Sequence, residues 1–329
     1  MNTLETVLTR FAEVFPIEEG WSEDRKFCVT DFGGKKFLLR FFDLEKADFK
    51  RTEFEMMKKV AAQGIPMCQP MEFGLCEDGA YCLLTWIEGI NLSLALKDMD
   101  REKQYQYGAA SGRILRRIQQ TPVPSEELEE SWEDYFNRKT DRRIAIAQGC
   151  PVNFRGQEEM TAYVQQHRHL LKGRPKTYQH GDYHVGNLMT DRSGAIQVID
   201  FDRYEFGDPW EEFVRIIFDV EASVDFACGK IDGYFDCRVP EEFWELLMFY
   251  LASNEIAAPA WGLQFTDGTG EKMVRMAEEV YDWFDGMKNP VPSWYENQSK
   301  FAAAFREIMA LSPAEYRREN GAKNTDSGQ

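Results

Sequence analysis

The sequence has few of the residues that bind transition metals. It contains only four histidines in 329 residues, and its seven cysteines form no C-x-x-C pair. Zinc sites and iron–sulfur clusters use closely spaced cysteine and histidine ligands, so a site of that kind is not expected. An odd number of cysteines, several of them in apolar surroundings, is instead typical of reduced core residues in a cytoplasmic protein.

Long apolar runs, a leader pattern and an excess of positive charge are also missing. No apolar run reaches the roughly 20 residues that cross a bilayer, and the N-terminus lacks a basic segment followed by an apolar one. Nucleic acids and anionic membranes are bound by basic surfaces, whereas the formal net charge is −17. We therefore expect neither as a partner. The negative charge permits a cationic ligand, although acidic surfaces also keep proteins soluble.

The most informative stretch surrounds two short apolar runs, Leu188–Thr190 and Ala195–Ile199. An Asp-Arg-Ser-Gly turn separates them, which predicts a β-hairpin. In a hairpin the residue before the first strand lies beside the residue after the second, so Asn187 and Asp200 become neighbours. Asp182 stands five positions earlier, in a loop with two glycines. Oxygen atoms of this kind are the ligands of Mg²⁺, and one carboxylate is left over for other chemistry.

Phosphoryl transfer needs a carboxylate that orients the attacking hydroxyl, and an Asn and an Asp on the metal that bridges the nucleotide phosphates. The order His-Gly-Asp-x₄-Asn, a strand and Ile-Asp-Phe resembles the aminoglycoside phosphotransferase and choline kinase-like family, which has a protein-kinase-like fold. This resemblance implies that Asp182 is the catalytic base, that Asn187 and Asp200 bind Mg²⁺, and that His180 supports the loop. Two roles stay open for Asp202: contact with metal or substrate, and shaping of the loop.

A cation in an apolar strand marks the N-terminal part of the chain. Alternation in Lys36–Phe42 places Arg40 on one face, where a buried charge needs a partner, unless it reaches solvent from an edge strand. The next segment, 45–63, has helical spacing, with an apolar face that begins at Phe49 and includes Glu53. The resemblance implies that Glu53 pairs with Arg40, which would hold the nucleotide phosphates. A solvated Glu53 is the alternative.

The resemblance also implies further contacts with the nucleotide. The turn at 20–26, which contains Ser22, resembles the loop that covers the phosphates, although it has one glycine where the family has several. A plain surface turn is the alternative. Residues 85–89 stand where the hinge between two lobes is expected, so the backbone of Trp86 and Ile87 would receive the purine edge.

The resemblance, together with the order of the expected elements, implies an α+β, two-lobed protein-kinase-like fold. We expect a nucleotide-binding lobe at 1–87, with an antiparallel sheet and a helix, and a larger, mainly helical catalytic and substrate-binding lobe at 88–329, whose tail from about 315 is frayed. Residues 1–15 have helical spacing and Asp208 has the context of a helix cap. Further elements are predicted as strands at 27–30, 35–42, 71–75 and 81–87, helices at 107–120, 125–147, 157–172, 241–257 and 270–287, and a loop at 258–268.

The resemblance implies an O-phosphotransferase that uses ATP or GTP and a small-molecule hydroxyl acceptor. An aminoglycoside or another cationic antibiotic is expected first, because residues 199–240 hold eleven acids against four bases; solvated helix faces are the other explanation of these acids. Choline, an amino alcohol or a sugar is the alternative acceptor. A nucleotide-binding pseudoenzyme or regulatory protein is the alternative from another class. A protein kinase is disfavoured because His184 stands where those enzymes carry lysine, and the oligomeric state stays open.

Overall fold

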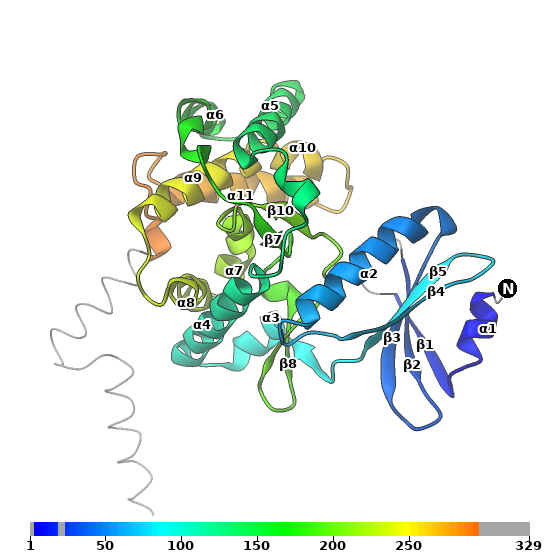
Figure 1. Ribbon diagram of the computed structural model, residues 1–329. Coiled ribbons are helices and arrows are strands. Elements are labelled where there is room, and N and C mark those ends of the chain that lie inside the picture. The colour runs from blue at the N-terminus through cyan, green and yellow to red at the C-terminus, as the bar shows by residue number, and fades with distance from the viewer. Residues whose placement is uncertain (1–2, 19–23, 296–329) are drawn as a thin grey trace, which may run out of the picture. The chain divides into compact units, whose positions relative to one another are not determined.

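The computed structural model describes residues 3–18 and 24–295, and the chain forms two compact units (Figure 1). The sheet unit comprises residues 1–98, 114–123 and 177–206, and the helical unit comprises residues 99–113, 124–176 and 207–329. The central motif therefore belongs to the same unit as the N-terminal strands. A lobe boundary between residues 87 and 88 stays a prediction. Ser22 and the tail from about residue 315 lie outside the described residues.

A five-stranded antiparallel sheet forms most of the sheet unit, in the order β1-β2-β3-β5-β4. The bounds are β1 Glu13–Ile17, β2 Arg25–Thr30, β3 Lys36–Phe42, β4 Pro70–Leu75 and β5 Ala80–Thr85. The strands predicted at β2 to β5 are confirmed. Strand β3 has neighbours on both sides, with Arg40 opposite Lys26 and Cys82. Arg40 thus sits on a central strand, and the edge-strand alternative is wrong.

The alternation in β3 separates two environments. Leu39 is fully buried in a core that includes the short helix α1 (Leu4–Leu8). Arg40 lies on the opposite face of the sheet, where Lys50 of helix α2 (Ala47–Ala61) reaches the same group of charges. One face of the strand therefore packs an apolar core while the other presents a buried cation.

The helix predicted at 45–63 is confirmed as α2, and its buried side explains which acid faces the sheet. Glu53 is 4% exposed and lies on the side that buries Met56 and Val60. Phe49 is 61% exposed, so its predicted place on the buried face is wrong. The buried side of α2 begins instead at Ala47 and continues at Glu53.

The helix predicted across residues 1–15 is wrong after α1. Residues Glu13–Ile17 pair with β2 as an edge strand. Pro16 has no N–H for a helical hydrogen bond, and its neighbours Val14 and Phe15 favour extended backbone. A proline is tolerated on an edge strand, where one side of the backbone needs no partner.

The central motif folds into short strands. Strands β8 and β9 form the predicted hairpin, which is confirmed, and β6 adds a third strand beside β8, while β7 pairs with β10. The bounds are β6 Gly89–Asn91, α3 Leu92–Ala95, β7 Thr177–Gln179, β8 Leu188–Asp191, β9 Ile196–Val198 and β10 Glu205–Gly207.

Helices make up the helical unit, and the helices predicted there are confirmed with shifted ends. The bounds are α4 Arg101–Ile118, whose last turn belongs to the sheet unit, α5 Trp132–Gly149, α6 Gln157–Gln166, α7 Ile216–Ala222, α8 Val224–Phe235, α9 Glu241–Glu255, α10 Ala258–Gly262 and α11 Thr269–Trp283. The loop predicted at 258–268 is wrong in its first half, where α10 begins at Ala258 with Pro259 in its first turn, a favourable position for proline. None of the helices in the described part of the chain is long and apolar enough to cross a membrane.

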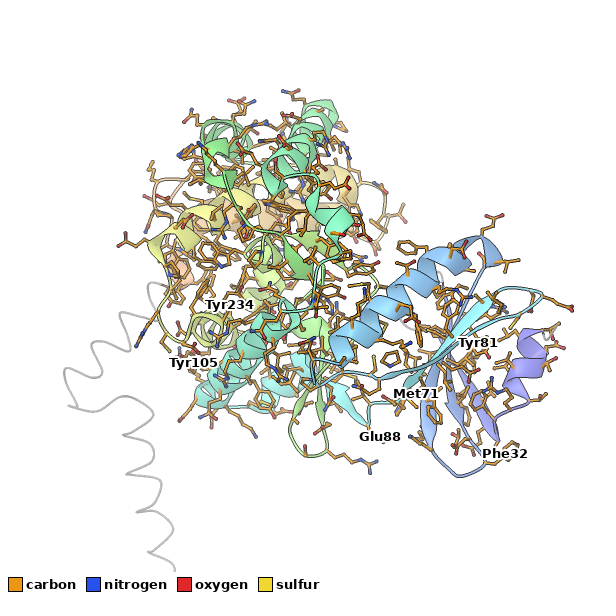
Figure 2. The ribbon with its side chains drawn as sticks, in the orientation of Figure 1. Phe32, Met71, Tyr81, Glu88, Tyr105 and Tyr234 are labelled. Carbon is orange, nitrogen blue, oxygen red and sulfur yellow. The ribbon has the colours of Figure 1, made fainter. Side chains whose placement is uncertain are left out.

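Helices α4 and α8 approach so closely that they exclude side chains at their crossing. A β-carbon at Gly229 would lie 2.1 Å from the backbone oxygen of Tyr105, and one at Gly108 would lie 2.0 Å from that of Phe226. Beside this contact, the Tyr105 hydroxyl donates to Asp232 of α8 (2.7 Å), and Figure 2 shows Tyr105 on its helix. Glycine is therefore required at the crossing because backbone packs directly on backbone.

We expect Gly229→Ala to destabilise the protein by about 1–3 kcal/mol, the usual cost of overpacking a dense interior. Gly149→Ala is the matched control. Gly149 ends α5, and among the described residues no atom outside its chain neighbours and the nearby backbone of its own helix lies within 4 Å of the position that a β-carbon would take there. Alanine favours helix over glycine, so the control should be unchanged or slightly more stable. Urea unfolding monitored by circular dichroism measures both. Equal midpoints for the two variants would contradict the close crossing.

Candidate active site

The hairpin brings the two expected metal ligands to one end. Strands β8 and β9 pair with Leu188 opposite Val198, and the N–H of Ile199 donates to the carbonyl of Asn187 (3.1 Å). Asn187 therefore lies beside the residue that precedes Asp200. The sequence pattern predicted this neighbourhood, while the roles of the two side chains stay predictions.

Asn187 also fixes the position of Asp182. Its Nδ2 donates to the backbone carbonyl of Asp182 (2.9 Å) and to the carboxylate Oδ2 (3.2 Å). The same Oδ2 has Nε2 of His184 and Nη1 of Arg203 at 3.9 Å each. One carboxamide thus holds both the backbone and the side chain of the candidate base.

His180 is fully buried beneath this loop. Its Nε2 donates to the carbonyl of Ile199 (3.0 Å), and its Nδ1 accepts the N–H of Asp182 (3.3 Å). These contacts require a neutral ring with its proton on Nε2, and burial lowers the pKa of His180 to about 4. The ring links the loop to the end of β9, which is what a supporting residue would do.

Two acids that follow β9 crowd one another. Asp200 adopts a left-handed backbone (φ 68°), which few residues other than glycine adopt. Burial and the negative charge of Asp202 raise the pKa of Asp200 to about 6. Burial also disfavours ionised Asp202, but the neighbouring Arg40 outweighs burial and lowers the pKa of Asp202 to about 2. A cation near the pair would relieve this crowding.

The oxygen donors at the end of the hairpin fit a hard divalent cation. Among the described residues, no three His, Cys, Asp or Glu side chains are grouped as a metal site. The predicted set uses one such residue, Asp200, together with the carboxamide of Asn187. Since Nδ2 of Asn187 donates hydrogen bonds to Asp182, the side-chain oxygen Oδ1 of Asn187 is the atom suited to bind a metal. Mg²⁺ commonly takes one or two protein oxygens and fills its other positions with water and phosphate oxygens.

Arg40 is 5% exposed and is held by two carboxylates. Its Nη2 donates to Oδ2 of Asp24 (2.6 Å) and to Oδ2 of Asp202 (2.9 Å). Burial opposes its charge, but these carboxylates more than compensate and raise the pKa of Arg40, so the guanidinium stays cationic. Segments far apart in the sequence therefore meet at one buried cation.

Glu53, the predicted partner of Arg40, is paired with another cation. Lys50, one turn earlier in α2, donates to Oε2 of Glu53 (3.0 Å) and lies 3.4 Å from Oδ2 of Asp24. No ion pair joins Arg40 to Glu53 within the part of the chain that is described, so the predicted direct pair is not formed. Lys50 competes successfully because it shares a helix with Glu53, whereas Arg40 is satisfied by Asp24 and Asp202.

Of the other three residues expected to contact the nucleotide, the structure describes two. Trp86 and Ile87 follow β5 directly and are half-buried, while Ser22 lies outside the described residues. Sequence reasoning missed Asp24 and Lys50 as members of the charged group. The helical spacing of Lys50 and Glu53 was a usable signal for one of them, whereas nothing local marked Asp24.

Several of the acids that suggested a cationic acceptor form ion pairs within the helical unit. Asp208 is fully buried in a two-point contact with Arg174. Its Oδ1 accepts the N–H of Trp210, but Trp210 is the N-cap of the helical turn Glu211–Arg215, so the predicted cap lies two positions too early. Asp219 pairs with Lys230 in a fully buried contact (2.7 Å), and Asp225 pairs with Arg101 (2.8 Å), whose side chain is 59% exposed. The charge of these acids is therefore largely neutralised by cations at contact distance.

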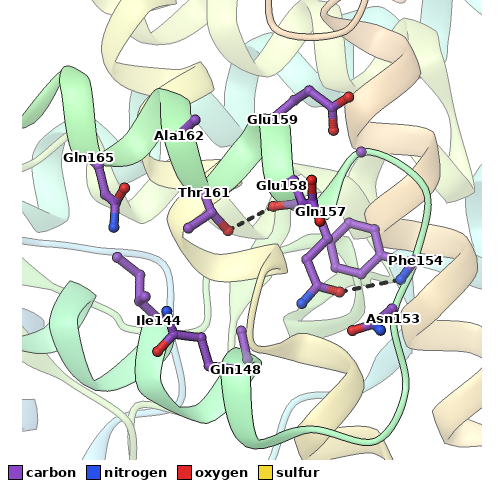
Figure 3. Close-up of a pocket in the computed structure, with 12 residues that line it drawn as sticks. Ile144, Gln148, Asn153, Phe154, Gln157, Glu158, Glu159, Thr161, Ala162 and Gln165 are labelled. Atoms are coloured by element: carbon purple, nitrogen blue, oxygen red, sulfur yellow. Dashed lines mark hydrogen bonds between the residues drawn. The ribbon is translucent and has the colours of Figure 1, made fainter.

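A hollow of about 520 Å³ lies between α5 and α6 in the helical unit (Figure 3). Its lining residues include four carboxamides and two acids, with no lysine or arginine among them: Gln148, Asn153, Gln157, Gln165, Glu158 and Glu159. None of the predicted site residues lines it. The hollow is therefore separate from the candidate active site.

The sequence matches the model of the phosphotransferase enzyme family over residues 13–244. No curated protein matches it at a significant level.

Solved structures share the fold at low sequence identity. A thermostable mutant of aminoglycoside phosphotransferase APH(4)-Ia, in a ternary complex with ADP and hygromycin B, has a TM-score of 0.61 at 17% identity, covering 85% of this chain and 96% of that one. The amicoumacin kinase hAmiN, in complex with AMP-PNP and Ca²⁺, has a TM-score of 0.63 at 14% identity, covering 89% and 96%. Spectinomycin phosphotransferase APH(9)-Ia has a TM-score of 0.56 at 13% identity, covering 82% and 93%. The predicted kinase-like fold class is confirmed.

We expect the buried His180 to make the protein sensitive to acid. Between about pH 6.5 and 4 the unfolded chain takes up a proton at this residue and the folded chain does not, so stability falls as the pH drops through this window. The loss approaches about 3 kcal/mol at the lower end. His180→Gln should lack this component, so its stability deficit relative to wild type should shrink from pH 7 to pH 4. Urea unfolding over this range measures it; a constant deficit would contradict the neutral buried ring.

Proposed function

The chain belongs to the phosphotransferase enzyme family, and from this premise we propose that it transfers the γ-phosphoryl group of ATP or GTP to a hydroxyl of a small molecule. The observation that carries the proposal is the contact of Asn187 Nδ2 with Asp182 Oδ2 (3.2 Å) at the end of the hairpin that also positions Asp200. A base, a carboxamide and a second acid are the protein groups that phosphoryl transfer requires.

In this proposal some residues act on the acceptor hydroxyl and others bind the nucleotide donor. Asp182 orients the acceptor hydroxyl and takes up its proton, while Asn187 holds the carboxylate of Asp182. Asn187 and Asp200 would hold Mg²⁺, which when bound neutralises charge on the phosphates. Arg40 supplies a cation for the donor phosphates, and the backbone at Trp86 and Ile87 receives the purine. Ser22 belongs to the segment that would cover the phosphates.

For the acceptor we propose an aminoglycoside or another cationic antibiotic. Two solved relatives carry hygromycin B and spectinomycin, and the net charge of −17 would attract a cation. The internal pairing of acids such as Asp208 and Asp219 favours a second candidate, a metabolic alcohol such as choline, an amino alcohol or a sugar. Such an acceptor would depend less on a long-range field.

A ligand screen tests the acceptor. Thermal shift is measured with Mg²⁺ and ATP or GTP present, across aminoglycosides, other antibiotics, amino alcohols and sugars, because a ligand that binds the folded state raises its melting temperature. Compounds that shift the transition are then assayed for phosphorylation. Turnover of a neutral acceptor with none of any cationic compound would contradict the antibiotic proposal, and no nucleotide consumption with any acceptor would contradict the proposed transfer.

We expect Asp182→Asn to lower kcat by about 10²–10⁴-fold, the usual contribution of a positioned base. Nucleotide affinity should change little, because Asp182 faces the acceptor in this proposal. The measurement is steady-state kinetics with the best acceptor, together with nucleotide binding by calorimetry. A variant that kept more than about a third of the wild-type kcat would remove Asp182 from this role.

We expect Asp200→Ala to abolish most of the Mg²⁺ dependence of nucleotide binding, and Asn187→Ala to reduce it less. A carboxylate contributes a full charge to a divalent ion, whereas a carboxamide contributes only a dipole. Titration of Mg²⁺ at a fixed concentration of a non-hydrolysable nucleotide measures both. Asp191→Ala, in the hairpin turn, is the control. Unchanged Mg²⁺ dependence in both site variants would exclude the proposed metal ligands.

A further inference from the structure

The charged group around Arg40 contains an acid that no role in phosphoryl transfer explains. Asp24 is 5% exposed at its side chain, and its Oδ2 faces two cations, Arg40 Nη2 at 2.6 Å and Lys50 Nζ at 3.4 Å. Both cations are also largely buried, with side-chain exposures of 6% and 10%. One carboxylate oxygen thus lies between two buried cations on the face of the sheet that carries Arg40.

The guanidinium of Arg40 has donor capacity that its carboxylates do not use. Both Asp24 and Asp202 accept from the same nitrogen, Nη2. The buried Nε has no hydrogen-bond partner among the described residues. Buried N–H groups are nearly always paired, so this one indicates that a ligand with several acceptor oxygens completes the group. A phosphate presents more oxygens to a guanidinium than a single carboxylate oxygen does.

Lys50 differs from the other lysine of α2 that has an acid one turn away. Lys58 contacts Glu55 (3.1 Å) in the same spacing as Lys50 contacts Glu53, but Lys58 and Glu55 are 51% and 54% exposed. Lys50 instead points its ammonium into the buried group, between Glu53 and Asp24. Lys58 and Glu55 are therefore a solvated surface pair, whereas Lys50 supplies a second cation beside Arg40.

We infer that Arg40 and Lys50 form a two-cation site for the polyphosphate of the donor, and that Asp24 occupies it as an internal substitute when no nucleotide is bound. The inference rests on the proposed function for the identity of the donor. On binding, a phosphate takes over the contacts of Asp24 with Arg40 Nη2 and Lys50 Nζ and reaches the Arg40 Nε. Asp202 keeps its contact with Arg40, and Glu53 keeps Lys50 in position. Asp24 therefore sets the affinity for the donor by competition.

The inference predicts opposite effects for two neighbouring substitutions. Asp24→Asn removes the competing charge and should tighten binding of inorganic tripolyphosphate and of ATP or GTP roughly tenfold, while lowering the melting temperature of the ligand-free protein. Lys50→Met removes a cation and should weaken the same ligands roughly tenfold. Neither variant should change the affinity for the nucleoside without phosphates. Lys58→Met is the matched control and should bind all ligands as wild type does.

Calorimetry at constant ionic strength measures these affinities, with melting curves to verify that each variant is folded. Tripolyphosphate is used because it has no base, so its binding reports on the cations alone. If wild type binds tripolyphosphate but Asp24→Asn binds it no more tightly, the inference is wrong and the proposed function stands. If Asp24→Asn does not fold, Lys50→Met decides: wild-type affinity in that variant overturns the two-cation site. If wild type binds neither tripolyphosphate nor any nucleotide, both the inference and the proposed function fail.

Discussion

Burying the guanidinium of Arg40 in the middle of a five-stranded sheet would cost several kcal/mol if no carboxylate faced it. Asp24, which directly precedes β2, and Asp202, which follows β9, supply that compensation. The cation therefore ties the central strand to the loop that carries the candidate metal ligand. A short backbone contact supports the same junction, since the N–H of Val198 donates to the carbonyl of Pro66 (2.8 Å). Sheet and motif are thereby held together within the sheet unit.

Close packing restricts the backbone of the loop that contains Gly181 and Asp182. Gly181 adopts φ 80°, and a β-carbon there would lie 1.7 Å from the carbonyl oxygen of Arg203. Only glycine permits this approach, which presses the residue before Asp182 against the segment that follows Asp202. His180 links the same loop to the carbonyl of Ile199, which follows β9. Asn187, five residues after Asp182, donates to the backbone carbonyl of Asp182. The position of Asp182 is therefore set by packing, and a base placed in this way loses little entropy when a substrate arrives.

The sequence predicted those features that depend on short-range pattern. Alternation in β3 placed Arg40 on the face opposite Leu39. The turn between two apolar runs predicted Asn187 and Asp200 as neighbours, and in the structure Asn187 lies beside Ile199, the residue before Asp200. It did not predict which acid would reach Arg40, because several carboxylates compete and distances between distant segments decide among them. It also missed the strand at Glu13–Ile17, where pairing with β2 outweighed helical spacing. Local pattern thus determined the elements, and tertiary distance determined the partners.

The acids between residues 199 and 240 show why a count of charges is a weak guide to a ligand. A count treats each acid alike, but Asp219 faces Lys230 in a fully buried pair, and Asp208 is enclosed by Arg174 and the hydroxyl of Tyr250. A charge neutralised at contact distance contributes little to the potential at a Debye length of roughly 10 Å. The field that would attract a cationic acceptor therefore comes from fewer groups than the net charge of −17 suggests. Such a field raises the rate at which the acceptor meets the protein more than it fixes the orientation of the bound acceptor. Alignment of the hydroxyl then depends on short-range contacts, in the first place with Asp182.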